Sequence, residues 1–184
     1  MTFLEAIILG IIQGLTEFLP VSSSGHLEIG TVLLGVKSKD NLLFSIVVHG
    51  ATALSTIVVF RKDILLIIKD ILKFEWNDSV EFSLKIIISM IPVGVVGVLF
   101  EDKISSFFGG QILLVGSMLI LTGLLLLFTF FKGQSSGNVT YPKAILIGIA
   151  QAIAIMPGIS RSGATISTAL LLGVDKEKAA KFSF

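Results

Sequence analysis

The stretch L-G-I-I-Q-G-L-T-E-F-L-P-V-S-S-S-G, residues 9–25, decides the fold of this chain. It starts as an apolar helix, breaks at Pro20 and the serines, and leads into further apolar sequence that ends at Gly35. The stretch I-G-I-A-Q-A-I-A-I-M-P-G-I-S-R-S-G, residues 147–163, has the same plan and ends at Gly173. Six pairs match at one constant offset: Gly10/Gly148, Gln13/Gln151, Ser22/Ser160, Ser24/Ser162, Gly25/Gly163 and Gly35/Gly173. The two stretches therefore predict an internal repeat.

The composition places the repeat in a membrane. Of the 184 residues, 53% are hydrophobic and 15% are charged, and the mean hydropathy is +0.95. Three long runs carry no Asp, Glu, Lys or Arg: 41–60, 86–100 and 107–131. At 1.5 Å per residue these runs reach or approach the thickness of a hydrocarbon core, roughly 30 Å. A soluble helical bundle, the alternative, would need far more surface charge. We predict an all-α integral membrane protein with spans at about 42–60, 84–100 and 111–131.

The repeat units themselves are too short and too broken to be ordinary spans. The Pro/Ser break leaves backbone groups unpaired, and lipid offers them no hydrogen bonds. We predict a re-entrant helix–loop–helix at residues 2–35 and another at 143–173, each entering and leaving the membrane on one side. A single kinked spanning helix in each copy is the alternative. Three spans lie between the copies, so the second copy enters from the opposite side. This predicts an inverted-topology repeat with both loops near the midplane, a plan that transporters use for central sites.

The repeat sets the expected domain boundaries. Residues 1–132 form the first repeat, and residues 141–184 begin the second. Three spans follow the first unit but only eleven residues follow the second. We therefore expect the chain to be truncated at its C-terminal end, with further helices beyond Phe184.

The basic residues predict an orientation. On one side of the predicted spans lie Lys37, Lys39 and Lys103. On the other side lie Arg61, Lys62, Lys69, Lys73, Lys85, Lys132, Lys143, Lys176, Lys178 and Lys181. The positive-inside rule puts this larger set in the cytoplasm, so the first re-entrant loop opens to the external face. A net charge of +1 gives no reason to expect nucleic acid, and the absence of cysteine excludes disulfides and thiolate metal sites.

Arg161 is the one basic residue inside an apolar element. A charge there is costly and indicates function. It lies between Ser160 and Ser162 at a predicted helix start, where hydroxyls, free N–H groups, the helix dipole and a guanidinium together suit a phosphate. Thr165, one turn later, adds a hydroxyl. A purely structural ion pair between Arg161 and Glu17 is the alternative.

The first loop offers different chemistry. Ser22, Ser23 and Ser24 precede His26, and Ser23 matches Arg161 in the repeat. Ser23 and His26 are three residues apart, so on a helix they share a face and could form a nucleophile–base pair. An N-cap serine beside a hydrogen-bonded histidine is the plainer interpretation. Glu17, with Gln13 four residues before it, could hold a hard divalent cation or act as a general base. His49, alone in a span, is interpreted as a packed histidine.

At these residues the sequence resembles the undecaprenyl-diphosphate phosphatases, the bacitracin resistance proteins of bacteria. Their signatures, (E/Q)-x-x-x-E and P-G-x-S-R-S-x-x-T, correspond here to residues 13–17 and 157–165, and P-V-S-S-S-G-H lies between them. The resemblance extends over the whole chain.

The resemblance implies a hydrolase that converts undecaprenyl diphosphate to undecaprenyl phosphate and inorganic phosphate. It also implies dependence on a divalent cation, Mg²⁺ or Ca²⁺, a location in the bacterial plasma membrane, and a role in recycling the cell-wall lipid carrier. On this chain it makes Ser23 the nucleophile, His26 the acid or base and Arg161 the phosphate-binding residue, with Glu17 and Gln13 serving the metal or base role. The expected partners are the lipid substrate and the bilayer, and a homodimer is left open.

Two other functions compete with this one. A transporter or flippase of a phosphorylated isoprenoid lipid would suit the inverted repeat, but a pure carrier should have similar loops, whereas these loops differ at Ser23 and Arg161. An intramembrane serine protease would have no use for the arginine between two serines. The residues leave open whether a phosphoseryl intermediate or an activated water carries the reaction.

Overall fold

The computed structural model describes residues 1–36, 41–107, 111–133 and 135–184, without the side chains of residues 41, 42 and 105. Within these ranges the regular structure is helical, apart from one isolated bridge between Gly137 and Val174. The helices are α1 Phe3–Glu17, α2 Ser23–Leu33, α3 Asn41–Val59, α4 Arg61–Ile71, α5 Asp78–Leu99, α6 Glu101–Phe107, α7 Ile112–Phe131, α8 Tyr141–Ile153, α9 Arg161–Leu171 and α10 Lys176–Ser183. The predicted all-α class is confirmed.

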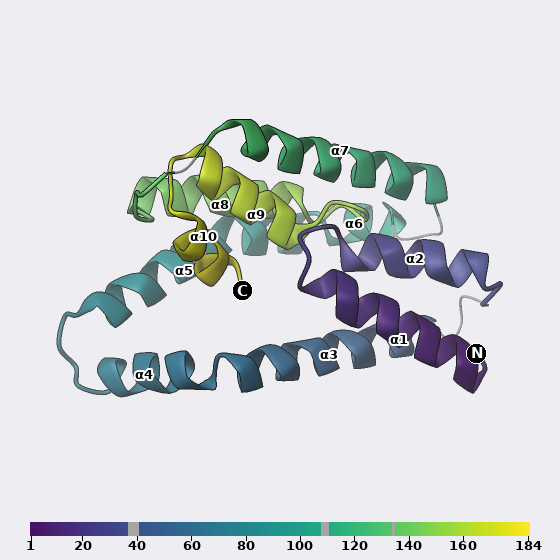
Figure 1. Ribbon diagram of the computed structural model, residues 1–184, viewed down its shortest axis with the longest axis horizontal. Coiled ribbons are helices and arrows are strands. Elements are labelled where there is room, and N and C mark those ends of the chain that lie inside the picture. Colours follow the sequence, from purple (N-terminus) through teal and green to yellow (C-terminus); the bar gives the residue numbers. More distant parts are fainter. Residues whose placement is uncertain (37–40, 108–110, 134) are drawn as a thin grey trace.

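Each predicted repeat unit forms a helical hairpin, α1–α2 and α8–α9. Figure 1 shows the two hairpins entering from opposite ends of the molecule, with their connecting loops at the centre. In the first hairpin a capping box fixes the start of α1: Thr2 N donates to Glu5 Oε2 at 2.7 Å, and Glu5 N donates to Thr2 Oγ1 at 3.3 Å. Gly30 lets α2 approach α1 closely, since a Cβ there would lie 2.9 Å from Leu9 Cδ2. The connecting loop is thereby held at the inner end of the hairpin.

The predicted spans correspond to helices that differ in their bounds. Of the described helices, α5 and α7 are each long and apolar enough to cross a membrane. The predicted span at 42–60 corresponds to α3, which continues into α4 through a bend of 73°. Helices α4, α6 and α10 were not predicted from the sequence. Their charged residues interrupt the apolar runs on which the span prediction rested, although charge on one face does not prevent a helix. Lys37 and Lys39, used in the orientation argument, lie outside the described residues.

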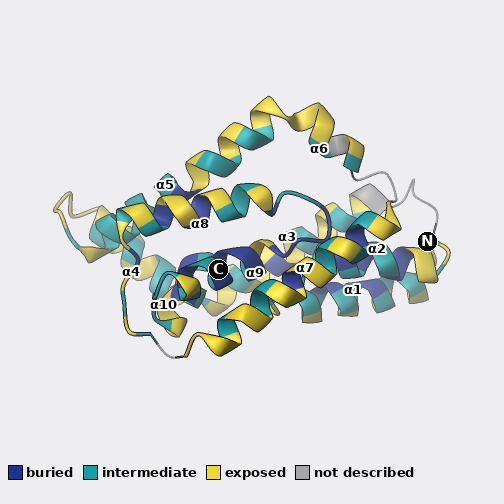
Figure 2. Cartoon of the chain, turned by 90° about the horizontal axis from the view of Figure 1, so that it is seen from above, coloured by how far each residue is buried: buried dark blue, intermediate teal, exposed yellow. Residues whose placement is uncertain are grey.

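The long helices expose large apolar side chains that a soluble protein would bury. On α7, Val115 and Thr122 are buried, whereas Leu113 is 86% and Phe130 80% exposed. Figure 2 shows the exposed surface along α5, α6 and α7, while buried positions gather on α8, α9 and their connecting loop. A helix that exposes leucine and phenylalanine and buries threonine is arranged for a lipid environment.

Helix α8 packs closely against α5. Ala144 and Ile147 of α8 are buried in one cluster with residues of α9 and α10. At Gly148 the two backbones touch, since a Cβ there would lie 2.4 Å from the carbonyl oxygen of Ser89 on α5. A small residue at such a crossing allows the close approach that stabilises helix pairs in membranes. This packing holds the second hairpin in place.

Replacement of Gly148 by alanine should therefore destabilise the protein. The added methyl group meets backbone, which cannot rotate away, and overpacking of this kind costs about 1–3 kcal/mol. Gly10→Ala is the matched control, because Gly10 occupies the equivalent repeat position and has open space around its Cα. Thermal unfolding in detergent should show a lower midpoint for Gly148→Ala alone. Equal midpoints for the two variants would contradict this packing.

Candidate active site

The two hairpin loops pack on each other reciprocally. A Cβ at Gly25 in the first hairpin would lie 3.2 Å from the Cα of Gly158 in the second loop. A Cβ at Gly163 in the second hairpin would lie 2.7 Å from the carbonyl oxygen of Pro20 in the first loop. Gly163 matches Gly25 in the repeat, and Gly158 stands at the same offset from Pro20. Equivalent positions thus make equivalent contacts across the centre.

Both loops end in the same helix cap. Ser22 Oγ accepts a hydrogen bond from Gly25 N at 3.3 Å at the start of α2, and Ser160 Oγ accepts one from Gly163 N at 2.9 Å at the start of α9. The next serine lies beside each cap, with Ser24 Oγ 3.4 Å from Ser22 Oγ and Ser162 Oγ 3.3 Å from Ser160 Oγ. The remaining first-turn N–H groups of a helix have no intrahelical partner. Two helix N-termini, each rich in hydroxyls, therefore meet at the centre.

A threonine that the sequence analysis did not select holds the second loop. Thr122 on α7 is buried, and its Oγ1 accepts a hydrogen bond from Ser160 N at 3.1 Å. The same hydroxyl lies 3.0 Å from Met118 O on its own helix and 3.4 Å from Gly158 O. Gly158 has φ +93°, and a Cβ there would lie 2.5 Å from Val115 O, so only glycine fits against α7. Thr122 is a polar residue in a helix that faces lipid, and this polarity is the sequence signal that could have identified it.

Glu17 and Ser23 form the central polar pair of the first loop. Ser23 Oγ donates a hydrogen bond to Glu17 Oε2 at 2.5 Å. Gln13 is fully buried, and its Nε2 donates to the same oxygen at 2.8 Å. Glu17 thus joins the end of α1 to the start of α2, and its carboxylate is aligned with the Ser23 hydroxyl as a general base would be.

The structure gives His26 a different partner from the one predicted. His26 Nδ1 lies 2.8 Å from the carbonyl oxygen of Ser22, and among the described contacts none joins the imidazole to Ser23 Oγ. A carbonyl only accepts, so Nδ1 carries the proton. The nucleophile–base pair suggested by the spacing of Ser23 and His26 is absent from this arrangement, because the ring turns back along its helix toward the preceding turn. His26 is instead hydrogen-bonded to Ser22, whose φ of 69° is left-handed.

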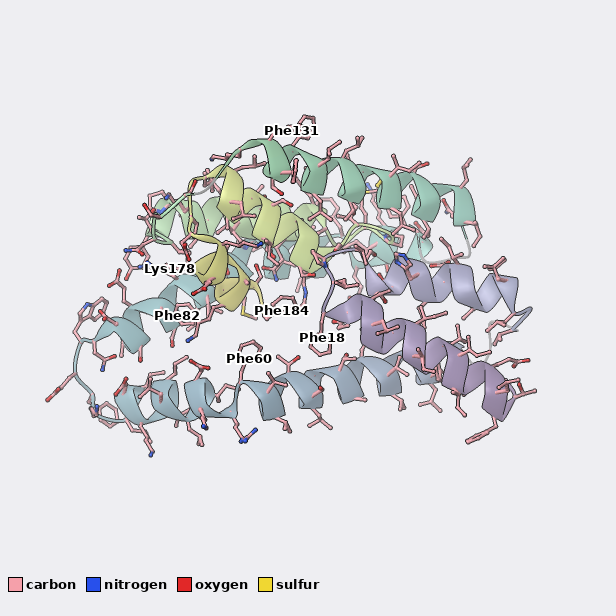
Figure 3. All side chains as sticks on the ribbon, in the orientation of Figure 1. Phe18, Phe60, Phe82, Phe131, Lys178 and Phe184 are labelled. Carbon is pink, nitrogen blue, oxygen red and sulfur yellow. The ribbon has the colours of Figure 1, made fainter. Side chains whose placement is uncertain are left out.

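Glu17, Ser23 and Arg161 line one central cavity of about 580 Å³. Ser22, Ser24, Ser160 and Ser162 also line it. Arg161 is exposed and, within the described part of the chain, forms no ion pair with Glu17. The structural ion pair considered above is therefore absent, and the guanidinium is available to a ligand. At one edge Phe18 and Phe184, labelled in Figure 3, lie with ring centroids 6.5 Å apart.

Thr165 contacts the backbone of Arg161 and does not line the central cavity. It is buried, and its hydroxyl donates to the carbonyl oxygen of Arg161 at 3.0 Å. With Arg161, Gln151 and Ser89 it lines a second cavity of about 30 Å³. The substrate-binding role of Thr165 stays a prediction.

A polar face of α3, made of Ser45, His49, Thr52 and Thr56, was also missed. His49, Thr52 and Thr56 line the central cavity. The face follows helical spacing, with intervals of four, three and four residues. That periodicity, more than any single residue, is the signal that could have identified it.

The residues that could hold a divalent cation are few. No cluster of three His, Asp or Glu side chains occurs among the described residues. Glu17 has one carboxylate oxygen, Oε1, that is not used by Gln13 or Ser23. Gln13 Oε1 is buried without a hydrogen-bond partner, and Gln13 does not line the cavity. Magnesium is often held by one or two carboxylates together with substrate phosphates. Glu17 thus has one oxygen free for a cation whose other ligands come from a bound phosphate, and Gln13 contacts Glu17 through its Nε2. A divalent cation held by Gln13 and Glu17 stays a prediction.

A family model described as bacitracin resistance protein BacA matches residues 6–184. The chain belongs to this family. Within it, the chain is 59% identical over its whole length to an undecaprenyl-diphosphatase of Christiangramia forsetii, of which it covers 70%. It is 52% identical to an undecaprenyl-diphosphatase of Bacteroides thetaiotaomicron, again over the whole chain and 70% of the relative. It is 45% identical to an undecaprenyl-diphosphatase of Methanococcus vannielii, over 98% of this chain and 72% of the relative.

The second loop of this chain should depend on Thr122 for its attachment to α7. Thr122→Val removes the acceptor of Ser160 N and leaves a buried donor unpaired, which costs about 1–3 kcal/mol. Thr129→Val is the matched control, since Thr129 Oγ1 donates only to Leu126 O on its own helix. Hydrogen exchange should show faster exchange of the backbone amides of residues 158–161 in Thr122→Val. Unchanged exchange there would contradict the anchoring role.

Proposed function

We propose that this chain hydrolyses undecaprenyl diphosphate to undecaprenyl phosphate and inorganic phosphate. The observation that carries the proposal is the Ser23–Glu17 hydrogen bond in the cavity that Arg161 also lines. With the roles proposed here, a nucleophile, a base and a phosphate-binding group line one cavity. The family and the names of its relatives support the same activity. By releasing the lipid monophosphate, the reaction would recycle the cell-wall lipid carrier and contribute to bacitracin resistance.

The membrane arrangement proposed for this activity is an inverted-topology repeat. The reciprocal contacts of Gly25 with Gly158 and of Gly163 with Pro20 support it, as do the two hairpins that enter from opposite ends (Figure 1). Such a site suits a substrate whose head group is a diphosphate and whose tail stays in lipid. The distribution of basic residues in the sequence favours a plasma-membrane location with the first loop open to the external face.

In the first step Ser23 Oγ attacks the terminal phosphorus while Glu17 takes its proton. The bond between that phosphorus and the bridging oxygen breaks, and its electron pair leaves with undecaprenyl phosphate. Arg161 lies at the first position of α9, where a guanidinium and free N–H groups can bind phosphate oxygens that gain charge.

In the second step water attacks the phosphorus of phosphorylated Ser23. The bond from phosphorus to Oγ breaks, Oγ recovers a proton from Glu17, and the hydrogens of the water leave on dihydrogen phosphate. A divalent cation bound by Glu17 and the diphosphate would neutralise phosphate charge and polarise the phosphoryl group. His26, held on the Ser22 carbonyl, keeps the loop in shape in this scheme.

Variants of the central residues test the proposal. Ser23→Ala and Arg161→Ala should each lower phosphate release from undecaprenyl diphosphate by at least about a thousandfold, because each removes a transition-state interaction. Ser117→Ala is the control, since Ser117 is exposed on α7 and bonds only to Leu113 O of its own helix. Release is measured in detergent or liposomes. Full turnover by Arg161→Ala would sink its assignment, and lipid translocation without any phosphate release by the unmodified protein would favour a carrier.

Removal of divalent cations tests the cation proposal separately. Chelation should abolish phosphate release and leave the unfolding midpoint unchanged, because the cation is held largely by substrate and a single carboxylate. Mg²⁺ or Ca²⁺ should restore turnover. Undiminished turnover with excess chelator would exclude the cation and leave the Ser23–Glu17 chemistry untouched.

A further inference from the structure

His49 supplies an imidazole to the central cavity that the proposed mechanism does not use. It comes from α3, an element outside both repeat hairpins, and it lines the same cavity as Glu17, Ser23 and Arg161. In Figure 1, α3 passes beneath the tips of both hairpins. The cavity is therefore bounded by the two loops on one side and by α3 on another.

The hydrogen bonds of His49 fix its tautomer. Nδ1 lies 2.7 Å from the carbonyl oxygen of Ser45, which only accepts, so Nδ1 carries the proton. The hydroxyl of Ser45 lies 3.3 Å from the same nitrogen. In the neutral ring Nε2 is then a hydrogen-bond acceptor. Among the described residues, no hydrogen bond to Nε2 is found.

The neighbouring hydroxyls on α3 are acceptors toward the cavity as well. Thr52 Oγ1 donates its hydrogen to His49 O at 2.9 Å, and Thr56 Oγ1 donates to Thr52 O at 3.0 Å. Because both hydroxyl hydrogens are used within the helix, the hydroxyl oxygens of Thr52 and Thr56 present lone pairs to the cavity. A surface of acceptors repels phosphate oxygens and favours a hydrogen-bond donor such as water.

The second step of the proposed reaction needs a water that is held near the phosphorus. Glu17 is hydrogen-bonded to Ser23 Oγ and so lies on the nucleophile side of the phosphorus. The entering and leaving oxygens of a phosphoryl transfer are roughly in line. The water that hydrolyses phosphorylated Ser23 must therefore approach from the side away from Oγ, where Glu17 cannot hold it.

We propose that His49 positions this hydrolytic water by accepting a hydrogen bond from it at Nε2, next to the hydroxyl of Thr52. The inference rests on the proposed function, because it concerns the second step of that reaction. The proton balance is unchanged: Glu17 returns its proton to Ser23, and the water hydrogens leave with phosphate. His49 acts by orienting the water and takes no proton.

The test compares His49→Leu with His49→Gln in the full chain. Each variant is mixed with undecaprenyl diphosphate labelled in its terminal phosphate, quenched in acid, and assayed for released phosphate and for protein-bound label. His49→Leu should lower turnover by about 10- to 100-fold, as expected for a misplaced reactant, while the fraction of labelled protein rises above that of the unmodified chain. His49→Gln should recover most of the turnover, because its amide oxygen can accept the same hydrogen bond. Ser55→Ala is the control, since Ser55 is exposed on α3 and does not line the cavity.

Three results would overturn the inference: unchanged turnover in His49→Leu, lower turnover with no rise in bound label, or a glutamine variant as slow as the leucine variant. The unfolding midpoints of both variants show whether each one still folds. If His49→Leu disturbs the fold, His49→Gln can still be compared with the unmodified chain. Failure of the unmodified chain to release phosphate would instead refute the proposed function.

Discussion

The packing of the two broken-helix loops against each other is the constraint on which the rest of the structure depends. Each break frees backbone groups that lipid cannot satisfy, so the breaks must be covered by protein or open to a polar cavity. Here each loop covers the other, through Gly25 against Gly158 and Gly163 against Pro20. A side chain at Gly25 or Gly163 would press on the backbone of the opposite loop. The requirement for close approach therefore explains the glycine that follows the two serines in both loops.

The two loops have similar backbone arrangements but carry different functional side chains. Both loops use a serine cap and a second serine, but the position between the serines is Ser23 in one and Arg161 in the other. Glu17 in the first copy corresponds to Ile155 in the second. The carboxylate and the guanidinium line one cavity without forming an ion pair in the described structure. An arrangement of this kind leaves space for a ligand that carries negative charge, and it suits an enzyme better than a carrier with two similar gates.

Much of this arrangement was predictable because polar residues in apolar sequence are rare and informative. The repeat, the serine loops and the convergence of Glu17 with Arg161 follow from such residues. The partner of Ser23 could not be read from spacing, since the direction of the His26 ring depends on the Ser22 carbonyl. For a related reason Thr122 was not singled out from the sequence, and His49 was interpreted as a packed histidine. Polar residues on α3 and α7 mark these positions in the sequence, but which segment they contact depends on packing between distant parts of the chain.

The central claim is that residues of both loops act on one phosphate in one site. A double-mutant cycle with Glu17→Gln and Arg161→Lys measures this directly, through the kcat/KM for phosphate release of each single variant and of the double variant. If both residues act on the same phosphoryl group, the double variant should lose clearly less than the product of the two single losses, with a coupling of about 0.5–3 kcal/mol. Losses that multiply within experimental error would mean that the two residues act independently, and would contradict a shared site.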